Sequence, residues 1–435
     1  MPCTLLHAAD IHLGYAQYGL EERQRDYYLA FRHMAEDAIA RQVDVVLLAG
    51  DLFHKRTVDA NTLYQAVVVL ELLRDAGITV VAVEGNHERP HYREPLSWLD
   101  FLAQRDLLVV LTPQWLEGRL HLLPWDQHER RGAYLDLAPN LRIVGCRYVG
   151  TSTPSVVADL ATAIPSLPEA ETRQTILMLH AGMEGVLDAY GGTLCENDLL
   201  PLRGWVQYVA LGHIHKPYER LDWVYNPGSL EATSATEAEW TDRGYYIVRV
   251  DADRGPHLPP EKIVIPNRPF VRLVCHVEGL SRPSQLWEAV RGIAAAASSG
   301  DENDLPPIVE LTLRGQLGFA RAALETERLQ AILQETFVPL VARVRDLTTV
   351  EPGEISLAVE LSRHELAQLV LRELIAKDTR LNALAEPLTH LALTLQEMTA
   401  NDPEPSEIVA TLDRWQEQHG RPFAQPDETA QQDEA

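Results

Sequence analysis

The sequence predicts an α/β protein whose first and largest part, residues 1–265, is built on strands that are buried on both faces. Short runs of Val, Leu and Ile alternate there with amphipathic segments, and Gly or a polar residue ends most runs. Near-continuous apolar runs are typical of strands that are covered on both faces. The order strand, helix, strand favours a layered sheet. The expected strands are 5–9, 43–49, 78–83, 107–111, 175–179 and 206–211, and the expected helices are 21–41, 59–76 and 95–105.

The sequence pattern changes twice in the rest of the chain. A Pro-Asn-Arg-Pro run at 266–269 precedes alternating strand-like and helical segments, which predict a smaller α+β domain at about 267–360. A capping box at 362–365 then opens a helical segment that extends to about 400. Residues 401–435 hold nine acidic and two basic side chains, and we expect a mobile tail with a short helix around Trp415.

Leucines in the helical segment follow a heptad pattern. Pro387 lies inside this pattern and should kink or restart the helix. Such a seam either docks another helix or coiled coil, or packs on the body of the same protein, and both interpretations stay open. The seam consists of Leu381, Leu384, Leu388, Leu391, Leu395 and Met398.

Composition excludes several classes of protein. The chain has 435 residues, 46% of them hydrophobic, and a formal charge of −25. No run approaches the roughly 18 apolar residues of a membrane span, and the N-terminus has no leader pattern, so we expect a cytoplasmic protein. The four cysteines are far apart, which favours small buried side chains over disulfides or a thiolate zinc site. The negative charge argues against a broad nucleic-acid-binding surface on this chain. It is compatible with a metal site that acts on phosphate.

Five short motifs lie at the ends of expected strands, where open α/β sheets place their ligands. Each motif is weak alone, because a single strand-end His is more often structural than a ligand. Their joint order is a strong signal. They are Asp10-Ile11-His12, Gly50-Asp51-Leu52-Phe53-His54, Gly85-Asn86-His87-Glu88, His180, and Gly212-His213-Ile214-His215.

The side chains of these motifs predict a binuclear metal centre. Carboxylate, amide and imidazole ligands suit Mn²⁺, Fe²⁺ or Zn²⁺. Seven ligands are too many for one ion, and Asp51 is the natural bridge between two ions. In extended segments, alternate side chains would face the metals, while Ile11 and Ile214 would face the core. The candidate ligands are Asp10, His12, Asp51, Asn86, His180, His213 and His215.

Through these motifs, residues 1 to about 265 resemble the calcineurin-like metallophosphoesterase superfamily, and in particular the SbcD-type DNA-repair exonucleases. His54 in the pattern G-D-x-F-H is the discriminating residue, because the phosphatases of the superfamily typically carry another residue there. The resemblance implies a four-layer sandwich of two mixed sheets flanked by helices. It also implies a capping domain at 267–360 and C-terminal helices at 362–400 that bind an SMC-like coiled-coil ABC ATPase.

The resemblance also assigns roles to residues. Four side chains would hold one metal: Asp10, His12, Asp51 and His215. Four would hold the other: Asp51, Asn86, His180 and His213. His87 would protonate or stabilise the leaving 3′ oxygen, and His54 would help to position the phosphate. Mn²⁺ is the expected metal.

Dimerisation through core helices is a further implication. The candidate surface is the apolar face of 59–76 together with 95–105, and packing of these helices on their own sheet is the alternative. The apolar face consists of Leu63, Ala66, Val67, Leu70 and Leu73.

Two features depart from the family pattern. Glu88 stands where the nucleases usually have Asp, and its side chain could support a ligand from outside the metal shell. The strong negative charge suggests that DNA contacts come from a local basic strip and from the ATPase. Candidates for the strip are Lys55, Arg89, Arg93 and Lys216, which could equally be ordinary solvated surface.

Three functions remain to be compared. The first is a Mn²⁺-dependent DNA exonuclease and endonuclease, the nuclease subunit of an SbcCD-like double-strand-break repair complex at the nucleoid. The second is a phosphodiesterase or phosphatase acting on a nucleotide, a small molecule or a phosphoprotein. The third, a non-catalytic scaffold, is disfavoured because every expected ligand and both catalytic histidines are present.

Overall fold

The computed structural model divides the chain into two compact units, Met1–Glu351 and Pro352–Ala435, and each is considered by itself. The described residues are 3–88, 96–137, 140–169, 173–187, 193–298, 305–350, 368, 371–372, 374–376, 381, 384–399 and 405–419.

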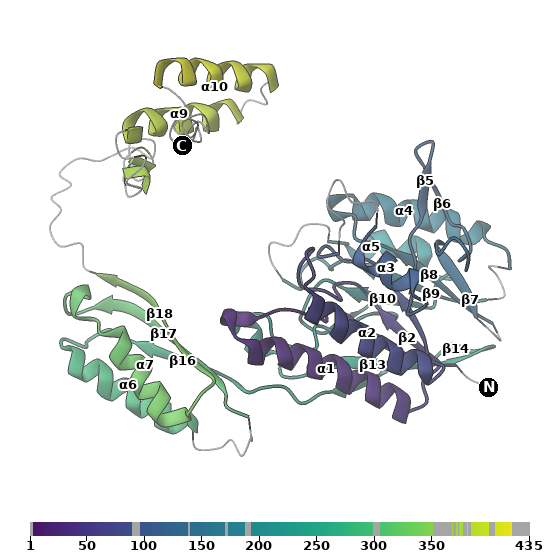
Figure 1. The fold of residues 1–435 in the computed structure, drawn as a ribbon, viewed down its shortest axis with the longest axis horizontal. Helices are drawn as coiled ribbons and strands as arrows, with labels where there is room; N and C mark the ends of the chain where they lie inside the picture. Colours follow the sequence, from purple (N-terminus) through teal and green to yellow (C-terminus); the bar gives the residue numbers. More distant parts are fainter. Residues whose placement is uncertain are drawn as a thin grey trace, which may run out of the picture. The chain divides into compact units, whose positions relative to one another are not determined.

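The first sheet holds the N-terminal strands (Figure 1). Its order is β14-β13-β1-β2-β3-β4, with β15 also paired to β13. Strands β1 to β4 run parallel, and β13 joins β1 antiparallel, so the sheet is mixed. The strands are β1 (Cys3–Ala8), β2 (Val45–Leu48), β3 (Thr79–Ala82), β4 (Val109–Val110), β13 (Gly244–Asp251), β14 (Gly255–Pro256) and β15 (Glu261–Val264).

The second sheet has the order β11-β12-β10-β9-β8-β7 and is also mixed. Its central strands β8, β9, β10 and β12 are parallel, and β7 and β11 are antiparallel edges. The strands are β7 (Tyr134–Leu137), β8 (Leu141–Cys146), β9 (Gln174–His180), β10 (Tyr208–Gly212), β11 (Tyr218–Arg220) and β12 (Val224–Asn226).

The two sheets pack face to face, and helices cover their outer faces (Figure 1). Leu47 and Val81 of the first sheet meet Met178 of the second in one buried cluster. A buried polar link joins the sheets as well, since the His7 ring bonds to the Tyr208 hydroxyl at 2.9 Å. The expected four-layer α/β sandwich is confirmed. The helices are α1 (Glu21–Ala40), α2 (Ala60–Asp75) and α3 (Trp98–Gln104) on the first sheet, with α4 (Thr153–Ala163) and α5 (Glu196–Leu199) on the second.

The expected strands and helices of the first part match β1 to β4, β9, β10 and α1 to α3 within a few residues. Local signals explain the helix starts: Asp59 accepts hydrogen bonds from the backbone of Asn61 and Thr62 at the start of α2. Strand β8 was not expected. Its second residue, Arg142, is a buried arginine whose guanidinium pairs with Asp136. In the sequence, this charged residue interrupts the apolar run that would have indicated a strand.

The apolar face of α2 packs on its own sheet. Ala66, Leu70 and Leu73 are fully buried in the cluster between α1, α2 and the first sheet. Of the two interpretations that the sequence left open for this face, packing on its own sheet therefore holds for these three side chains. Tyr64 of α2 and Phe101 of α3 are exposed instead.

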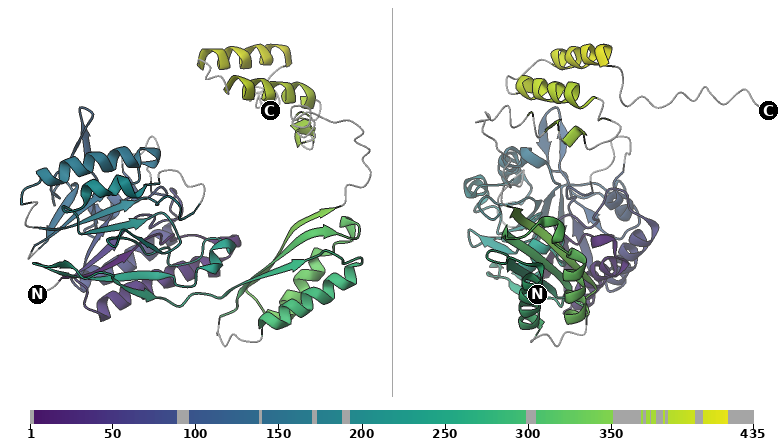
Figure 2. Two further views of the ribbon diagram at one scale, coloured as in Figure 1. Left: turned by 180° about the vertical axis from the view of Figure 1, so that it is seen from behind. Right: turned by 90° about the vertical axis from the view of Figure 1, so that its left-hand side faces the viewer.

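Residues 270–350 form a second α/β layer with its own core (Figure 2). Three parallel strands carry two helices on one face, and Leu311 and Leu313 are fully buried between them. Arg268, just before this layer, makes a bidentate ion pair with Asp26 of α1. The elements are β16 (Phe270–His276), α6 (Pro283–Ser298), β17 (Ile308–Leu317), α7 (Thr326–Phe337) and β18 (Val341–Val350). The domain limits read from the sequence stay predictions.

The second compact unit contains α9 (Ala385–Thr399) and α10 (Pro405–His419). Pro387 lies in the first turn of α9, so it begins a helix and does not kink one. The indole N–H of Trp415 donates to the Pro387 carbonyl at 3.1 Å, which ties α10 to α9. Part of the expected acidic tail is thus helical. The expected capping box at 362–365 lies outside the described residues.

Among the described helices, none combines the length and the apolar character that crossing a membrane requires.

A glycine lies where the two sheets approach each other closely. A Cβ on Gly212, the last residue of β10, would lie 2.1 Å from the Ala49 carbonyl oxygen and 3.0 Å from the Cβ of Ala9. Residues 9 and 49 directly follow β1 and β2, so the two sheets can meet at this edge only if β10 ends without a side chain.

The Gly212→Ala variant should therefore be less stable than the wild type by about 1–3 kcal/mol, the usual cost of forcing a methyl group into a packed interior. Urea unfolding followed by circular dichroism measures the difference. Gly292→Ala in α6 is the control, because its Cβ meets nothing within 4 Å and should stabilise that helix by about 0.5–1 kcal/mol. An unchanged unfolding midpoint for Gly212→Ala would contradict the close approach.

Candidate metal centre

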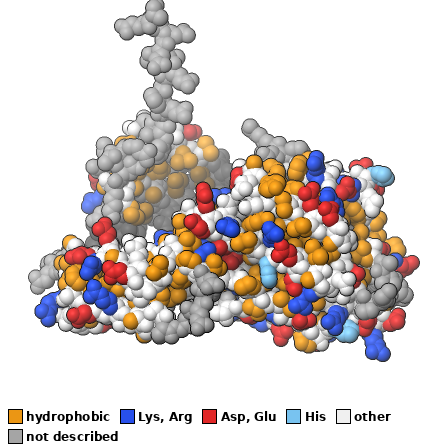
Figure 3. Space-filling view, turned by 60° about the horizontal axis from the view of Figure 1, so that its bottom comes forward, with side chains coloured by type: hydrophobic (Ala, Val, Ile, Leu, Met, Phe, Trp, Pro, Cys, Tyr) orange, Lys and Arg blue, Asp and Glu red, His pale blue; other side chains and the backbone are white. Residues whose placement is uncertain are grey.

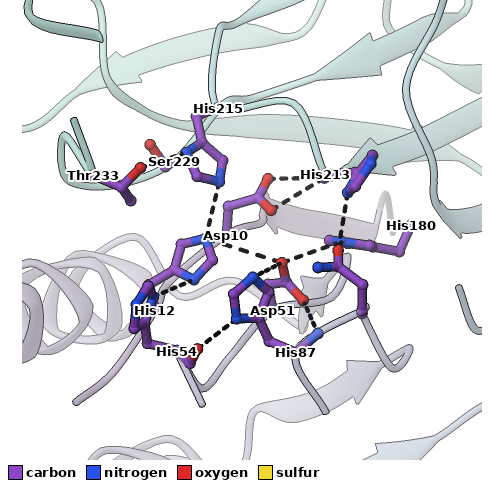
Figure 4. Close-up of polar contacts among 12 residues, drawn as sticks. Asp10, His12, Asp51, His54, His87, His180, His213, His215, Ser229 and Thr233 are labelled. Atoms are coloured by element: carbon purple, nitrogen blue, oxygen red, sulfur yellow. Dashed lines mark hydrogen bonds and ion pairs between the residues drawn. The ribbon is translucent and has the colours of Figure 1, made fainter. Parts of the chain in front are cut away.

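The strand-end motifs of both sheets converge at one edge of the sandwich (Figure 4). All seven expected ligands lie there, together with His54 and His87. Asp10, His12, Asp51 and His180 are almost fully buried, with at most 2% of each residue exposed. Such burial of carboxylates among imidazoles is costly unless charges are compensated.

The backbone bends sharply to bring these side chains together. Four of the ligands, none of them glycine, have positive φ angles: Asp10 (54°), His12 (53°), Asp51 (53°) and His213 (88°). Backbone strain of this kind persists only where the surroundings enforce it, and it concentrates at functional sites. The expectation that alternate side chains converge from extended segments is thus wrong in its geometry. Ile11 and Ile214 do face the core, each 1% exposed.

Hydrogen bonds between the loops hold the bends. The Asp10 N–H donates to the Gly50 carbonyl at 3.1 Å, and the His12 N–H donates to the Asp51 carbonyl at 3.0 Å. Asp10 also accepts the His213 N–H through both carboxylate oxygens, at 3.0 and 3.1 Å. The loop after β10 is therefore joined to the loop after β1, and the first sheet is joined to the second.

One group of potential ligands surrounds Asp10. The carboxylate of Asp10 and ring nitrogens of His12 and His215 lie within 4.8 Å of one another. The Nε2 atoms of His12 and His215 are 2.9 Å apart, and Asp51 Oδ2 lies 4.0 Å from His12 Nε2. These are the four side chains that the family resemblance assigns to one metal.

A second group surrounds Asn86. Its side-chain oxygen lies 3.1 Å from His180 Nε2 and 3.0 Å from His213 Nδ1. His180 Nε2 is 3.4 Å from Asp51 Oδ2, so Asp51 stands between the two groups. The central position suits a bridging carboxylate.

Outer hydrogen bonds orient two of the imidazoles. His180 Nδ1 lies 2.7 Å from the Ala49 carbonyl, which can only accept, so Nδ1 carries a proton and Nε2 is the nitrogen that faces the cluster. His215 Nδ1 lies 3.0 Å from a Glu237 carboxylate oxygen, which has the same effect. Metal-binding histidines in proteins are held in this way. The residues therefore fit a pair of divalent cations.

Electrostatics in the cluster reflect two buried carboxylates among imidazoles. Burial raises the pKa of Asp10 to about 6. Burial also opposes the charge of Asp51, but His180 holds the pKa of Asp51 well below its usual range. Asp51 in turn raises the pKa of His180 to about 9 against the effect of burial. Burial and a neighbouring His lower the pKa of His213 to about 3 and that of His54 to about 4.

His54 and His87 form the exposed side of the cluster. His87 Nδ1 is hydrogen bonded to the His54 carbonyl, and its Nε2 lies 3.8 Å from Asp51 Oδ2. The His87 side chain is 31% exposed, in contrast to the buried ligands. The His54 ring stacks on Tyr15, with ring centroids 3.8 Å apart. Both imidazoles therefore border the ligands on the side that a substrate can reach.

Glu88 holds two of the metal-site loops through hydrogen bonds to their backbones. Its buried carboxyl group accepts the backbone N–H groups of Gly85, Asp51 and Phe53 at 2.7, 3.0 and 2.8 Å. Burial and the Asp51 charge raise the pKa of Glu88 to about 8, while the three N–H donors favour its ionised form. The Glu found here in place of Asp thus joins two of the metal-binding loops.

The predicted DNA-contact residues are only partly placed. Lys55 is exposed next to His54, and its charge contributes to the low pKa of that histidine. Lys216 is half-buried after His215. Arg89 and Arg93 lie outside the described residues.

Sequence reasoning missed two contributors. Tyr15 lies only a few residues after the first motif and, as an aromatic side chain near it, could have been noticed. Glu237 lies in the 3-10 helix η5 (Ala235–Glu239) and has no motif of its own. Its carboxylate also pairs with Arg243, and despite burial His215 lowers the pKa of Glu237 to about 2. Only the folded chain brings it to the site.

Comparison with known proteins agrees with this geometry. A DNA double-strand break repair protein Mre11 of Aeropyrum pernix is 26% identical over 336 residues, which cover 75% of this chain and 77% of that protein. Mre11 proteins of Methanosarcina mazei and Archaeoglobus fulgidus are 31% and 32% identical, over 66% and 53% of this chain. The matches cover 42% and 51% of those two relatives, so the chain spans only about half of their length.

The family model described as Calcineurin-like phosphoesterase matches residues 3–217, which contain all seven candidate ligands and both exposed histidines. This segment, just under half of the chain, is therefore similar to the calcineurin-like phosphoesterases.

Proposed function

We propose that the chain is a DNA nuclease that hydrolyses phosphodiester bonds at a pair of divalent metal ions, and that these ions are Mn²⁺. The observation that carries this proposal is the convergence of seven candidate ligands from five loops, four of them buried, with His54 and His87 on the accessible side. Similarity to proteins named for DNA double-strand break repair supports DNA as the substrate.

The chain's own residues divide the chemistry between them. Metal ions held by the seven ligands would neutralise the phosphate charge and lower the pKa of a water molecule. The His87 Nδ1–H is held by the His54 carbonyl, so a protonated Nε2 is the atom that donates to the leaving 3′ oxygen. The His54 ring, fixed against Tyr15, contacts the phosphate.

DNA binding must be local, because the chain carries a charge of −25. Basic and acidic side chains are interspersed on the face drawn in Figure 3, and among the described residues there no continuous basic patch covers that face. Lys55 is the exposed cation next to the site. We propose that it contributes to phosphate binding and that a partner protein supplies most of the grip on duplex DNA.

The proposed partner is an SMC-like coiled-coil ATPase in a double-strand-break repair complex at the nucleoid. The ATPase would bind to the C-terminal helices of this chain. The heptad residues Leu388, Leu391 and Leu395 of α9 are only half-buried there. A homodimer would use the outer side of α2 and α3, where Tyr64 is 67% and Phe101 38% exposed.

Two substitutions should separate metal binding from proton transfer. His87→Ala should slow the Mn²⁺-dependent degradation of end-labelled duplex DNA by about 10²- to 10⁴-fold and retain both metals, because this variant lacks only the proton donor. Asp51→Asn should lose metal and activity together. Cleavage assays and elemental analysis of the dialysed proteins measure both effects.

A chromogenic phosphodiester is assayed beside the DNA. If the wild type hydrolyses it and leaves DNA intact, alone or with its ATPase, the enzyme is a small-substrate phosphodiesterase and the nuclease proposal fails. Loss of metal from His87→Ala would refute the role given to that residue.

Glu88→Gln should weaken Mn²⁺ binding by about 10- to 100-fold, the usual effect of removing an outer support of a metal site. The amide keeps the shape of the side chain but turns an NH₂ group towards backbone N–H donors. Calorimetric Mn²⁺ titration measures the change, and Glu129→Gln on the exposed surface is the matched control. Equal affinities in the two variants would show that Glu88 does not organise the loops.

A further inference from the structure

A cavity of about 460 Å³ lies beside the metal-site loops and is not used by the chemistry described above. Its walls come from three places in the fold. Trp115 belongs to β5 (Gln114–Leu116), which forms a hairpin with β6 (Arg119–His121). Arg147 and Tyr148 directly follow β8, and Glu84 precedes the Gly85-Asn86-His87 motif. In Figure 1 the hairpin rises next to α4.

The cavity shares a wall with the metal site. The Tyr148 ring lines the cavity, and its centroid lies 5.1 Å from that of His213 and 5.9 Å from that of His180. The Tyr148 N–H donates to the Glu84 carbonyl at 2.8 Å, which joins the ends of β8 and β3. A group in the cavity would therefore lie next to a phosphate held at the metals.

The lining suits a flat heteroaromatic ring. Trp115 is 37% exposed, and the Arg147 guanidinium carbon lies 5.9 Å from the centre of its ring. Aromatic rings and guanidinium planes both stack on nucleobases, with little dependence on the base. The volume lies in the range of small-molecule sites.

The buried side chain of Glu84 argues against a phosphate as the occupant. Glu84 is 6% exposed and lines the same cavity. An acidic group repels a phosphate, whereas its oxygens can accept the N–H groups on the edge of a base. Stacking surfaces with an acceptor beside them are complementary to a base.

We propose that this cavity binds one nucleobase of the DNA strand, immediately next to the phosphodiester bond that is cleaved. The base stacks on Trp115 and Arg147, and the cavity thereby positions the adjacent phosphate at the metals. This inference rests on the proposed nuclease function and adds a base-binding subsite to it.

The test uses single-stranded oligonucleotides in which a tetrahydrofuran abasic residue is moved, one position at a time, across the cleaved bond. In the wild type, the abasic residue should slow cleavage by on the order of 10- to 100-fold at one position only, as expected from loss of one stacked base. Trp115→Ala should slow cleavage of the intact strand by a similar factor and reduce the intact-to-abasic ratio to about 1. Arg147→Ala should reduce the ratio in part.

The ratio is measured within one protein preparation, so partial misfolding of a variant does not change it. Leu116→Ala is the matched control, because Leu116 is 50% exposed on the same strand and does not line the cavity, and it should keep the wild-type ratio. Binding of the same oligonucleotides to His87→Ala, followed by fluorescence anisotropy, should show the same preference for the intact strand.

Two results would overturn the subsite. A ratio near 1 at every position in the wild type, or a wild-type ratio that survives in Trp115→Ala, removes the base-binding role while DNA cleavage continues and the nuclease proposal stands. Hydrolysis of the chromogenic phosphodiester without any DNA cleavage removes the proposed function and the subsite together.

Discussion

Two buried carboxylates at the junction of the sheets are the constraint on which the rest of the structure depends. Asp10 and Asp51 are at most 2% exposed, and burial of such charges is costly unless partners compensate it. Backbone N–H groups and imidazoles do so here, and the backbone accepts left-handed conformations at four ligands to bring them close. An arrangement of carboxylates and inward-facing imidazole nitrogens favours cations, which explains why strain is retained at this edge.

The supports of the site are spread over the whole first part of the fold. Glu88 holds the loops of the first sheet through three backbone N–H groups, and Glu237 orients His215 from a short helix that follows the second sheet. Arg243, directly before β13, pairs with Glu237. Strand β13 returns to pair with β1, so the support of one ligand is connected through the sheet to the loop that carries two others.

The charge of the chain and the chemistry of its site act on different length scales. A net charge of −25 repels DNA at a distance, whereas a bound pair of divalent ions attracts phosphate over a few ångströms. If the chain acts on DNA as proposed, it would therefore depend on short-range recognition. In the proposed function, the exposed Lys55, the stacking surfaces of Trp115 and Arg147, and a partner protein would each supply a part of this recognition.

The sequence by itself determined the positions of β1 to β4, β9, β10 and α1 to α3, because apolar periodicity is a local signal, and its strand-end motifs marked the polar side chains that the fold brings together at one edge. It could not reveal β8, where buried Arg142 interrupts the apolar pattern, or the left-handed bends at Asp10 and Asp51. Only the tertiary structure decided that Glu237 orients His215, that α2 buries its apolar face on its own sheet, and that Trp115 and Tyr148 line one cavity. These contacts join residues far apart in the chain, so they exist only once the chain has folded.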